Sequence, residues 1–594
     1  MSRPTSYMDH PSGNEANFPW SAWNGAWLRG GSEVGIISDE SGAPALVTFN
    51  AEGHLPPRTV PLGEWHLVTF APVGDSIVLM VDRGGNEGIQ LLKYDEDLPQ
   101  LLTPDAGETN LFYGAAFDDG RIAYSSNRLS PSSMEIVVQG LCDNDPHVFA
   151  IGEGFFTVRD ACSATNVLLV SERLSNVHNR LHLLDVSTES FGVVTTEEAH
   201  YAGAVFAGNG ARIICRTDLR SEYMRLAVYD IELCSWSFLT EDSFDVDCFD
   251  VGSCAGGEEL TYSANILGES VLHQVRLDNP AENLPLPAYP KGVISSIHSD
   301  PQSRRLLVSV SGPNTSPSIW RLGRSGEVDR LSGAESAGEL GSIDCSQFTL
   351  TSFDGLPISA LLYSTSVRSR SAVILVHGGP EDQARPHFDP MIRSLVFAGF
   401  DVICPNVRGS TGYGRSFTSL DDGGQRWGAF RDVRAIADVA RLQFGYARLA
   451  VAGGSYGGYV AVSMMMFYPG VFDAAVSIVG MTNLVTFLEG TAPQRRAIRE
   501  AEYGSLERDK ESLSALSPIH EAKRLAAPLL LIHGRNDSRV PVHEAMQLIE
   551  AVDTATLVDM VIYEDEGHGL SHRSNQIDAY GRMCAFFTQT LNRY

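Results

Sequence analysis

A serine flanked by glycines is the first residue in this chain whose setting suggests chemistry. Ser455 lies in the stretch AVAGGSYGGYVAV, residues 450–462, between an apolar run and a helix-forming run. The stretch fits the pattern G-x-S-x-G, in which a strand turns sharply into a helix and exposes the serine oxygen as a nucleophile. The turn strains the backbone and leaves no room for neighbouring Cβ atoms, so small residues must flank the serine. The alternative is a glycine-rich turn with a bystander serine, and the rest of the chain has to decide.

A serine nucleophile needs a base to take its proton and an acid to orient that base. In α/β-hydrolases these residues follow the serine in the order Asp, His, each on a loop after a strand. Asp537 follows the apolar run PLLLIHG, and His568 lies in a glycine-flanked loop after the run LVDMVIY. Order and context therefore predict a Ser455/Asp537/His568 triad. Three other histidines are rivals for the base, and we expect them to be structural: His533, His543 and His572.

The oxyanion of an acyl-transfer reaction needs two backbone N–H donors aimed at it. One expected donor is the amide of Tyr456, directly after the nucleophile. The other is expected from the loop His377-Gly378-Gly379-Pro380, which follows the buried-looking strand AVILV. Those glycines would also suit a plain tight turn, so residue types alone do not decide between Gly378 and Gly379.

The elements around these residues indicate a parallel α/β domain over residues 340–594. Apolar strands alternate with helical segments from AVILV at 372–376 onward, as in a parallel sheet with helices on both faces. We place the boundary with the preceding domain near the Gly/Ser/Glu stretch LSGAESAGELGS, residues 331–342.

Residues 30–335 have a different pattern, with short β-type runs, turns and few helical segments. Seven strong runs align at spacings of 43 to 47 residues on Ile37, Val81, Tyr124, Val170, Cys215, Tyr262 and Ser309. Most are followed by a second run, such as IQLLKY or LHLLDV. A period in the forties with several strands per unit is typical of a β-propeller, so we predict seven blades after an N-terminal segment, residues 1–29. One or two β-sandwiches are the alternative.

Composition limits the function classes. The chain has 594 residues, 43% of them hydrophobic, and a formal charge of −29, which argues against nucleic-acid or anionic-membrane partners. Nine scattered cysteines without a metal-binding pattern suggest a reduced, cytoplasmic protein with no structural metal site, and no cofactor motif is evident. No apolar run is long enough to span a bilayer, and the N-terminus lacks the apolar core of a signal peptide.

The C-terminal domain resembles the prolyl oligopeptidase (S9) family of serine peptidases, most closely its acylaminoacyl-peptidase-like branch. The resemblance rests on motifs along the whole domain: HGGPEDQARPHF at 377–388, PNVRGSTGYGRSF at 405–417, GGSYGGY at 453–459, REAEYG at 499–504, GRNDSRVP at 534–541 and EGHG at 566–569. That family also carries an N-terminal propeller, in agreement with the seven-fold period.

The resemblance implies hydrolysis of short peptides at a site buried between two domains. It implies Ser455 as nucleophile, Asp537 as orienting acid and His568 as base, with the amides of Gly379 and Tyr456 as oxyanion hole. It also implies an apolar substrate pocket near Met481, Val485, Phe487 and Val540. Arg495 and Arg496 could bind a substrate carbonyl or carboxylate, although a solvated helix face is the stronger interpretation.

Two other functions are compatible with the sequence. The same triad could serve an amidase or esterase, or an acyl-transferring or cyclising enzyme acting on a small peptide-like metabolite. A catalytically silent propeller scaffold is the remote alternative, disfavoured by the complete triad. Homo-oligomers are possible for either function.

Overall fold

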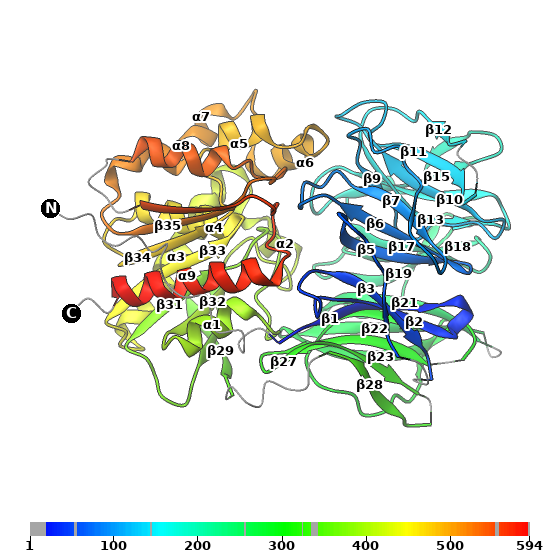
Figure 1. Ribbon diagram of the computed structural model, residues 1–594, viewed down its shortest axis with the longest axis horizontal. Coiled ribbons are helices and arrows are strands. Elements are labelled where there is room, and N and C mark those ends of the chain that lie inside the picture. Colours follow the sequence, from blue (N-terminus) through cyan, green and yellow to red (C-terminus); the bar gives the residue numbers. More distant parts are fainter. Residues whose placement is uncertain are drawn as a thin grey trace.

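The computed structural model describes residues 19–591 except 53–55, 143–144, 255–256, 304, 324, 334–341 and 553–557. Two domains lie side by side, a ring of small sheets (blue to green) and a sheet covered by helices (yellow to red), as Figure 1 shows. Most of the predicted boundary stretch and of the N-terminal segment lies outside the described residues. No described helix is long and apolar enough to cross a membrane. The eight cysteines described in the structure are free thiols.

The N-terminal domain is a seven-bladed β-propeller, which confirms the predicted architecture. Its seven sheets have four strands each. The strands of the first four sheets are β1 Ala22–Leu28, β2 Glu33–Ser38, β3 Ala45–Asn50, β4 Arg58–Thr59; β5 His66–Val73, β6 Ser76–Asp82, β7 Gln90–Tyr94, β8 Gln100–Leu101; β9 Asn110–Leu111, β10 Arg121–Ser126, β11 Glu135–Gly140, β12 His147–Phe149; β13 Phe155–Cys162, β14 Val167–Arg173, β15 Asn179–Asp185 and β16 Phe191–Val193. Those of the last three are β17 Tyr201–Ala207, β18 Arg212–Thr217, β19 Arg225–Asp230, β20 Ser235–Phe238; β21 Asp245–Cys254, β22 Gly257–Ile266, β23 Glu269–Arg276, β24 Asn279–Asn283; β25 Val293–Ser299, β26 Leu306–Gly312, β27 Thr315–Leu322 and β28 Val328–Ser332.

Each of the seven runs aligned in the sequence is the second strand of its sheet. In β6, for example, six of seven residues are buried, because neighbouring sheets cover both of its faces. A strand buried on both faces carries apolar residues at successive positions rather than only at alternate ones. That is why these strands gave the strongest repeat.

The ring closes by packing the first sheet against the last one. Ala22, Trp27 and Val34 share a hydrophobic cluster with Leu307 and Ile319. The sequence analysis placed the start of the propeller at residue 30. Its first strand in fact begins earlier, at Ala22. The repeat alignment missed β1 because it was anchored on the second strands.

The C-terminal domain is an α/β-hydrolase fold, as predicted. Its eight-stranded sheet has the order β29-β30-β32-β31-β33-β34-β35-β36, with β29, β30 and β32 paired antiparallel and the other pairs parallel. The strands are β29 Asp344–Thr351, β30 Pro357–Ser364, β31 Ser371–Val376, β32 Asp401–Asn406, β33 Arg448–Gly454, β34 Ala474–Ile478, β35 Leu529–Gly534 and β36 Val558–Tyr563. The helices are α1 Pro390–Phe397, α2 Arg415–Thr418, α3 Trp427–Leu442, α4 Tyr456–Phe467, α5 Leu484–Gly490, α6 Pro493–Tyr503, α7 Lys510–Ala515, α8 His543–Ala551 and α9 Arg573–Leu591.

Helices cover both faces of this sheet. The core on one face includes Phe430 of α3, Val460 of α4 and Leu548 of α8. The core on the other includes Leu395 of α1 and Phe586 of α9. The loops at the carboxyl ends of the parallel strands face the propeller (Figure 1), and ligands of open α/β sheets bind at that edge.

Candidate active site

Ser455 occupies the strained turn between β33 and α4. Its backbone has φ 53° and ψ −117°, a conformation that residues with a Cβ rarely adopt. The flanking glycines are required by close backbone approach. A Cβ on Gly457 would lie 2.0 Å from the carbonyl oxygen of Val376, and one on Gly453 would lie 2.5 Å from the same oxygen. The sharp turn therefore depends on these two residues, and it holds the serine at the end of the sheet.

The structure brings Ser455, His568 and Asp537 together in one hydrogen-bonded chain. His568 Nε2 lies 2.9 Å from Ser455 Oγ, and His568 Nδ1 lies 2.8 Å from Asp537 Oδ2. The other carboxylate oxygen, Asp537 Oδ1, accepts hydrogen bonds from the amides of Arg539 and Val540, both at 2.9 Å. The buried Asp537 carboxylate is thereby fixed in orientation, and it can hold one imidazole tautomer and stabilise an imidazolium.

A buried glutamate, which the sequence analysis did not single out, organises the loop that carries His568. Glu566 is fully buried and accepts hydrogen bonds from Ser571 and His572 amides at 2.8 and 2.9 Å, and from Asn575 Nδ2 at 2.8 Å. It thus ties the loop to the start of α9. Glu566 lies in the motif EDEGHG, so the sequence shows that it is close to His568. Nothing in the sequence distinguishes this buried glutamate from its two solvated acidic neighbours.

The three rival histidines have other surroundings. His533 Nε2 lies 2.8 Å from the carbonyl oxygen of Val540, and burial lowers the pKa of His533. His572 is bonded to Glu566 and its ring meets His66 of the propeller edge-on. His543 is exposed at the start of α8. Of the described histidines, His568 is the one hydrogen-bonded to Ser455.

The predicted oxyanion donors lie on both sides of the serine. Tyr456 is the first residue of α4, where amides have no partner within the helix. Its side chain is buried and its hydroxyl donates to Asp421 at 3.0 Å. On the opposite loop, a Cβ on Gly378 would lie 3.8 Å from Ser455 Cβ. Gly379, the predicted donor, is the next residue, and its φ of 116° suits glycine.

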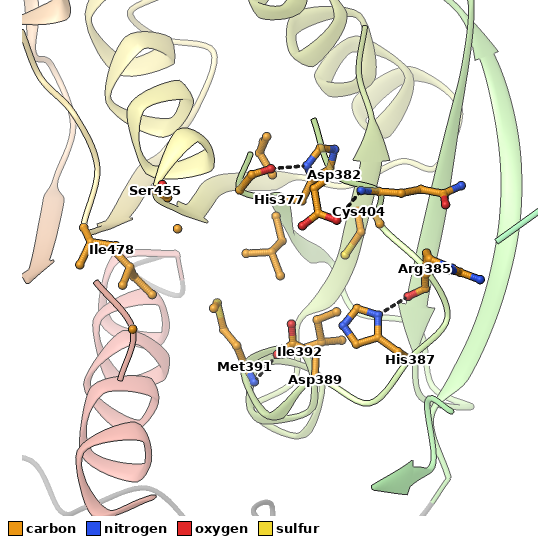
Figure 2. A pocket seen from close by; sticks show the side chains of 18 of the residues that line it. His377, Asp382, Arg385, His387, Asp389, Met391, Ile392, Cys404, Ser455 and Ile478 are labelled. Carbon is orange, nitrogen blue, oxygen red and sulfur yellow. Dashed lines mark hydrogen bonds between the residues drawn. The ribbon is translucent and has the colours of Figure 1, made fainter. Parts of the chain in front are cut away.

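A cavity of about 370 Å³ lies directly beside Ser455. Figure 2 shows Ser455 and Ile478 on one side, with Met391 and Ile392 of α1 on another. His377, Asp382, Arg385, His387 and Asp389 form the polar part of its wall (Figure 2). The cavity can accept an apolar group next to the reactive serine, with polar atoms at one end.

The residues predicted for a substrate pocket do not line this cavity. Met481, Phe487 and Val540 are buried in the hydrophobic core beside α4, and Val485 packs against that core. Arg495 is held by the propeller residue Glu87 at 3.3 Å, so it does not occupy a solvated helix face. Arg496 donates to the carbonyl oxygen of Glu489 at 2.7 Å.

One propeller loop touches both triad loops. Asn536 Nδ2 donates to the carbonyl oxygen of Gly84 at 2.9 Å, and Ser538 Oγ donates to Glu87 at 2.9 Å. Arg539 also binds Glu87. A Cβ on Gly567, next to His568, would lie 1.8 Å from the carbonyl oxygen of Gly85. The loops that carry Asp537 and His568 are thus packed against the propeller.

An acidic cluster lies behind Tyr456. Asp421, Asp422 and Glu502 place carboxylate oxygens within 4.8 Å of one another, the one described group with metal-like spacing. The Arg426 guanidinium binds Asp421 at 2.9 Å and also binds Glu502, so a cation already occupies part of this cluster. Burial raises the pKa of Asp422 to about 7, and the neighbouring Glu502 adds to that shift.

Fold and site together define an α/β-type serine hydrolase with a propeller domain. Residues 386–593 match the model of the prolyl oligopeptidase family. Dipeptidyl peptidase family member 6 of Caenorhabditis elegans is 33% identical over 231 residues, 37% of this chain and 31% of that protein. The acylamino-acid-releasing enzyme of Homo sapiens is 28% identical over 217 residues, 35% of this chain and 30% of that enzyme. The crystal structure of puromycin hydrolase matches with a TM-score of 0.83 at 18% identity, covering 97% of this chain and 95% of that one.

The matches confirm the family that the motifs indicated. The C-terminal domain belongs to the prolyl oligopeptidase (S9) family of serine peptidases, and acylaminoacyl enzymes are among its relatives. The aligned segments span less than a third of the length of each of these two relatives. The likeness to puromycin hydrolase extends over both domains and concerns their fold.

Proposed function

We propose that the protein hydrolyses short peptides through an acyl-enzyme on Ser455. The observation that carries this proposal is the hydrogen-bonded chain from Ser455 through His568 to Asp537, with the serine on a strained turn beside a cavity. The matched family and the Caenorhabditis elegans relative, which are peptidases by name, support a peptide substrate.

Each residue has a defined part in the proposed reaction. Ser455 Oγ attacks the carbonyl carbon while His568 Nε2 takes its proton, and Asp537 stabilises the resulting imidazolium. The amides of Tyr456 and Gly379 donate to the oxyanion. His568 then protonates the leaving amine, and water, activated by the same imidazole, releases the acyl group. The cavity beside Ser455 receives an apolar substrate side chain.

The propeller supports a preference for short substrates. It covers the face of the hydrolase domain from which the triad loops project, and its Gly84–Glu87 loop packs against them. A folded protein cannot enter such a site without separating the domains, whereas a short flexible peptide can.

The experiment that tests the proposal is labelling with an active-site-directed organophosphonate, together with a substrate screen. We expect one phosphonate adduct on Ser455, absent in Ser455→Ala, and hydrolysis of blocked or free-amino chromogenic peptides that the variant lacks. Rapid ester cleavage without any peptide cleavage would favour the esterase alternative. If neither an adduct nor hydrolysis is found, the remaining interpretation is a catalytically silent propeller scaffold.

A further inference from the structure

A second cavity, of about 310 Å³, lies in the propeller and is lined by three arginines. Arg159 is on β13, Arg173 ends β14, and Arg216 is on β18. Tyr113, Asn176 and His200 also contribute to its wall. Three cationic side chains around one small cavity are unusual in a chain with a formal charge of −29.

The three guanidinium groups are held by neutral partners. Arg173 donates to the carbonyl oxygen of Ser175 at 3.2 Å and to Asn176 Oδ1 at 2.9 Å. Arg216 donates to the carbonyl oxygens of Val246, at 3.0 Å, and Asp247. Arg159 lies over the ring of Tyr113, 4.6 Å from its centre. No carboxylate among the described residues lies within 4.0 Å of any of the three guanidinium groups.

The nearest acidic groups are committed elsewhere. Asp160 accepts hydrogen bonds from the amides of Ala161 and Phe206, at 2.8 and 2.7 Å. Asp247 accepts from Arg385 at 2.7 Å. Burial raises the pKa of Glu381 to about 8, so this residue holds its proton at neutral pH. Asp160 still attracts Arg159 electrostatically, and Asp245 attracts Arg216, but neither carboxylate pairs directly with a guanidinium group of the cavity.

The pKa values of the groups around the cavity show that its positive charge is unfavourable. Burial lowers the pKa of Arg159 and of Arg173. Burial, followed by the nearby Arg216 and Arg173, lowers the pKa of His200 to about 3, which leaves the imidazole neutral. Buried cations without a counter-ion are unfavourable, and an anion placed among them would be bound strongly.

The arginine cavity lies on the side of the propeller that faces the catalytic loops. His178 and His200 line both this cavity and a neighbouring one of about 210 Å³, whose wall includes Glu381. Glu381 is two residues beyond Gly379. Arg173 is also close enough to interact electrostatically with Arg539, two residues beyond Asp537.

We propose that Arg159, Arg173 and Arg216 form a carboxylate-binding subsite that holds the free C-terminal carboxylate of a short peptide while Ser455 attacks a bond nearer its N-terminus. The proposal rests on the peptide hydrolysis proposed above. Guanidinium groups match a carboxylate through paired hydrogen bonds, and a free C-terminus is the one anion that every unblocked short peptide carries. An α-ammonium group would be repelled, so the arginines also set the direction in which a peptide binds.

The test measures binding to Ser455→Ala by calorimetry, so that it does not depend on turnover. The probes are an N-acetylated apolar tetrapeptide as free acid, the same peptide as C-terminal amide, and the amide with one residue replaced by glutamate. We expect the amide to bind about tenfold to a hundredfold more weakly than the acid. Arg159→Gln and Arg173→Gln, each added to Ser455→Ala, should remove that difference.

Arg180→Gln is the matched control, because Arg180 is a half-exposed arginine on β15 of the same sheet, 3.8 Å from Glu172. It should keep the full preference for the acid, and melting temperatures of all variants verify folding. The glutamate-containing amide can also bind as tightly as the free acid and lose that affinity in Arg159→Gln. This result would support the subsite and show that it accepts side-chain carboxylates as well.

Equal binding of acid and amide would overturn the proposal, as would a preference that survives both Arg159→Gln and Arg173→Gln. Failure of the proposed function has a different result. In that case the wild-type chain cleaves no peptide and takes up no phosphonate, whatever the binding measurements give.

Discussion

At the residue scale, His568 and His572 are four positions apart but have different partners. His568 joins Ser455 to Asp537, whereas His572 is bonded to Glu566 and contacts His66. We expect His568→Ala to lower kcat by about 10⁵-fold or more, because the serine loses its base. His572→Ala should keep kcat within about tenfold of the wild-type value, since it removes a contact outside the Ser455–His568–Asp537 chain. Steady-state kinetics of the two purified variants decide, and the opposite ranking would assign the base to His572.

At the element scale, the turn from β33 to α4 depends on specific glycines. Gly457→Ala puts a methyl group 2.0 Å from the Val376 carbonyl oxygen, whereas a Cβ on Gly454 meets nothing within 4 Å. We expect Gly457→Ala to cost roughly 3 kcal/mol or more of stability and to abolish activity, because the backbone cannot give way without moving β31. Gly454→Ala is the control and should leave the melting temperature nearly unchanged. Similar melting temperatures for both variants would show that the turn tolerates a side chain.

The loop after β31 contains a second testable feature, the partly buried side chain of Glu381, whose Oε1 atom is shielded from solvent. Burial raises its pKa from 4.5 to about 8. Between these two pH values the unfolded chain has released this proton and the folded chain has kept it, so stability falls as pH rises from about 4.5 to 8. Glu381→Gln removes that dependence. We therefore expect the melting temperature of Glu381→Gln, relative to wild type, to increase steadily between pH 5 and pH 8.

The free-energy difference behind that trend is on the order of 1 kcal/mol per pH unit. Glu507→Gln is the control, because Glu507 is exposed on the same domain. A difference between Glu381→Gln and wild type that stays constant over this range would mean that Glu381 is ionised in the folded chain.

At the scale of the whole molecule, Glu87 links the propeller to the catalytic loops through Ser538, Arg539 and Arg495. Those arginines keep the pKa of Glu87 lowered although burial opposes it. We expect Glu87→Gln to lower kcat/KM about tenfold or more, because it frees the loop that carries Asp537 and leaves two arginines unpaired. Glu64→Gln is the control, an exposed partner of Arg83 near the same sheet. Unchanged kinetics in Glu87→Gln would show that the triad is positioned without the propeller.

The capping role of the propeller predicts size selection. The intact protein should cleave peptides below about thirty residues and leave folded proteins and unfolded ones such as casein undigested, because a long chain cannot reach Ser455 between the docked domains. A chain that begins at residue 342 should be poorly soluble, since it exposes the surface that the propeller covers. Gel electrophoresis of casein digests tests this directly. Rapid casein digestion by the full chain would contradict the capping role and leave the serine chemistry unaffected.

The sequence by itself determined the features that local geometry imposes. Glycines around Ser455 are required wherever a Cβ would strike the backbone, so the turn was recognisable from residue types alone. Apolar strands that alternate with helices predicted the parallel sheet. The order of Ser455, Asp537 and His568 after those strands predicted the triad. The second strands of the blades are buried on both faces, so their apolar runs marked seven repeats.

Only the tertiary structure decided what depends on segments far apart in the chain. The cavity beside Ser455 is lined by residues from α1, the loop after β34 and the loop before α9, whereas the pocket residues inferred from sequence lie in the core. The contact of Glu87 with Arg539 joins positions 452 residues apart, and the arginine cavity collects side chains from different blades. Periodicity describes which face of an element is buried. It does not say which other element covers that face, and packing between domains settles this.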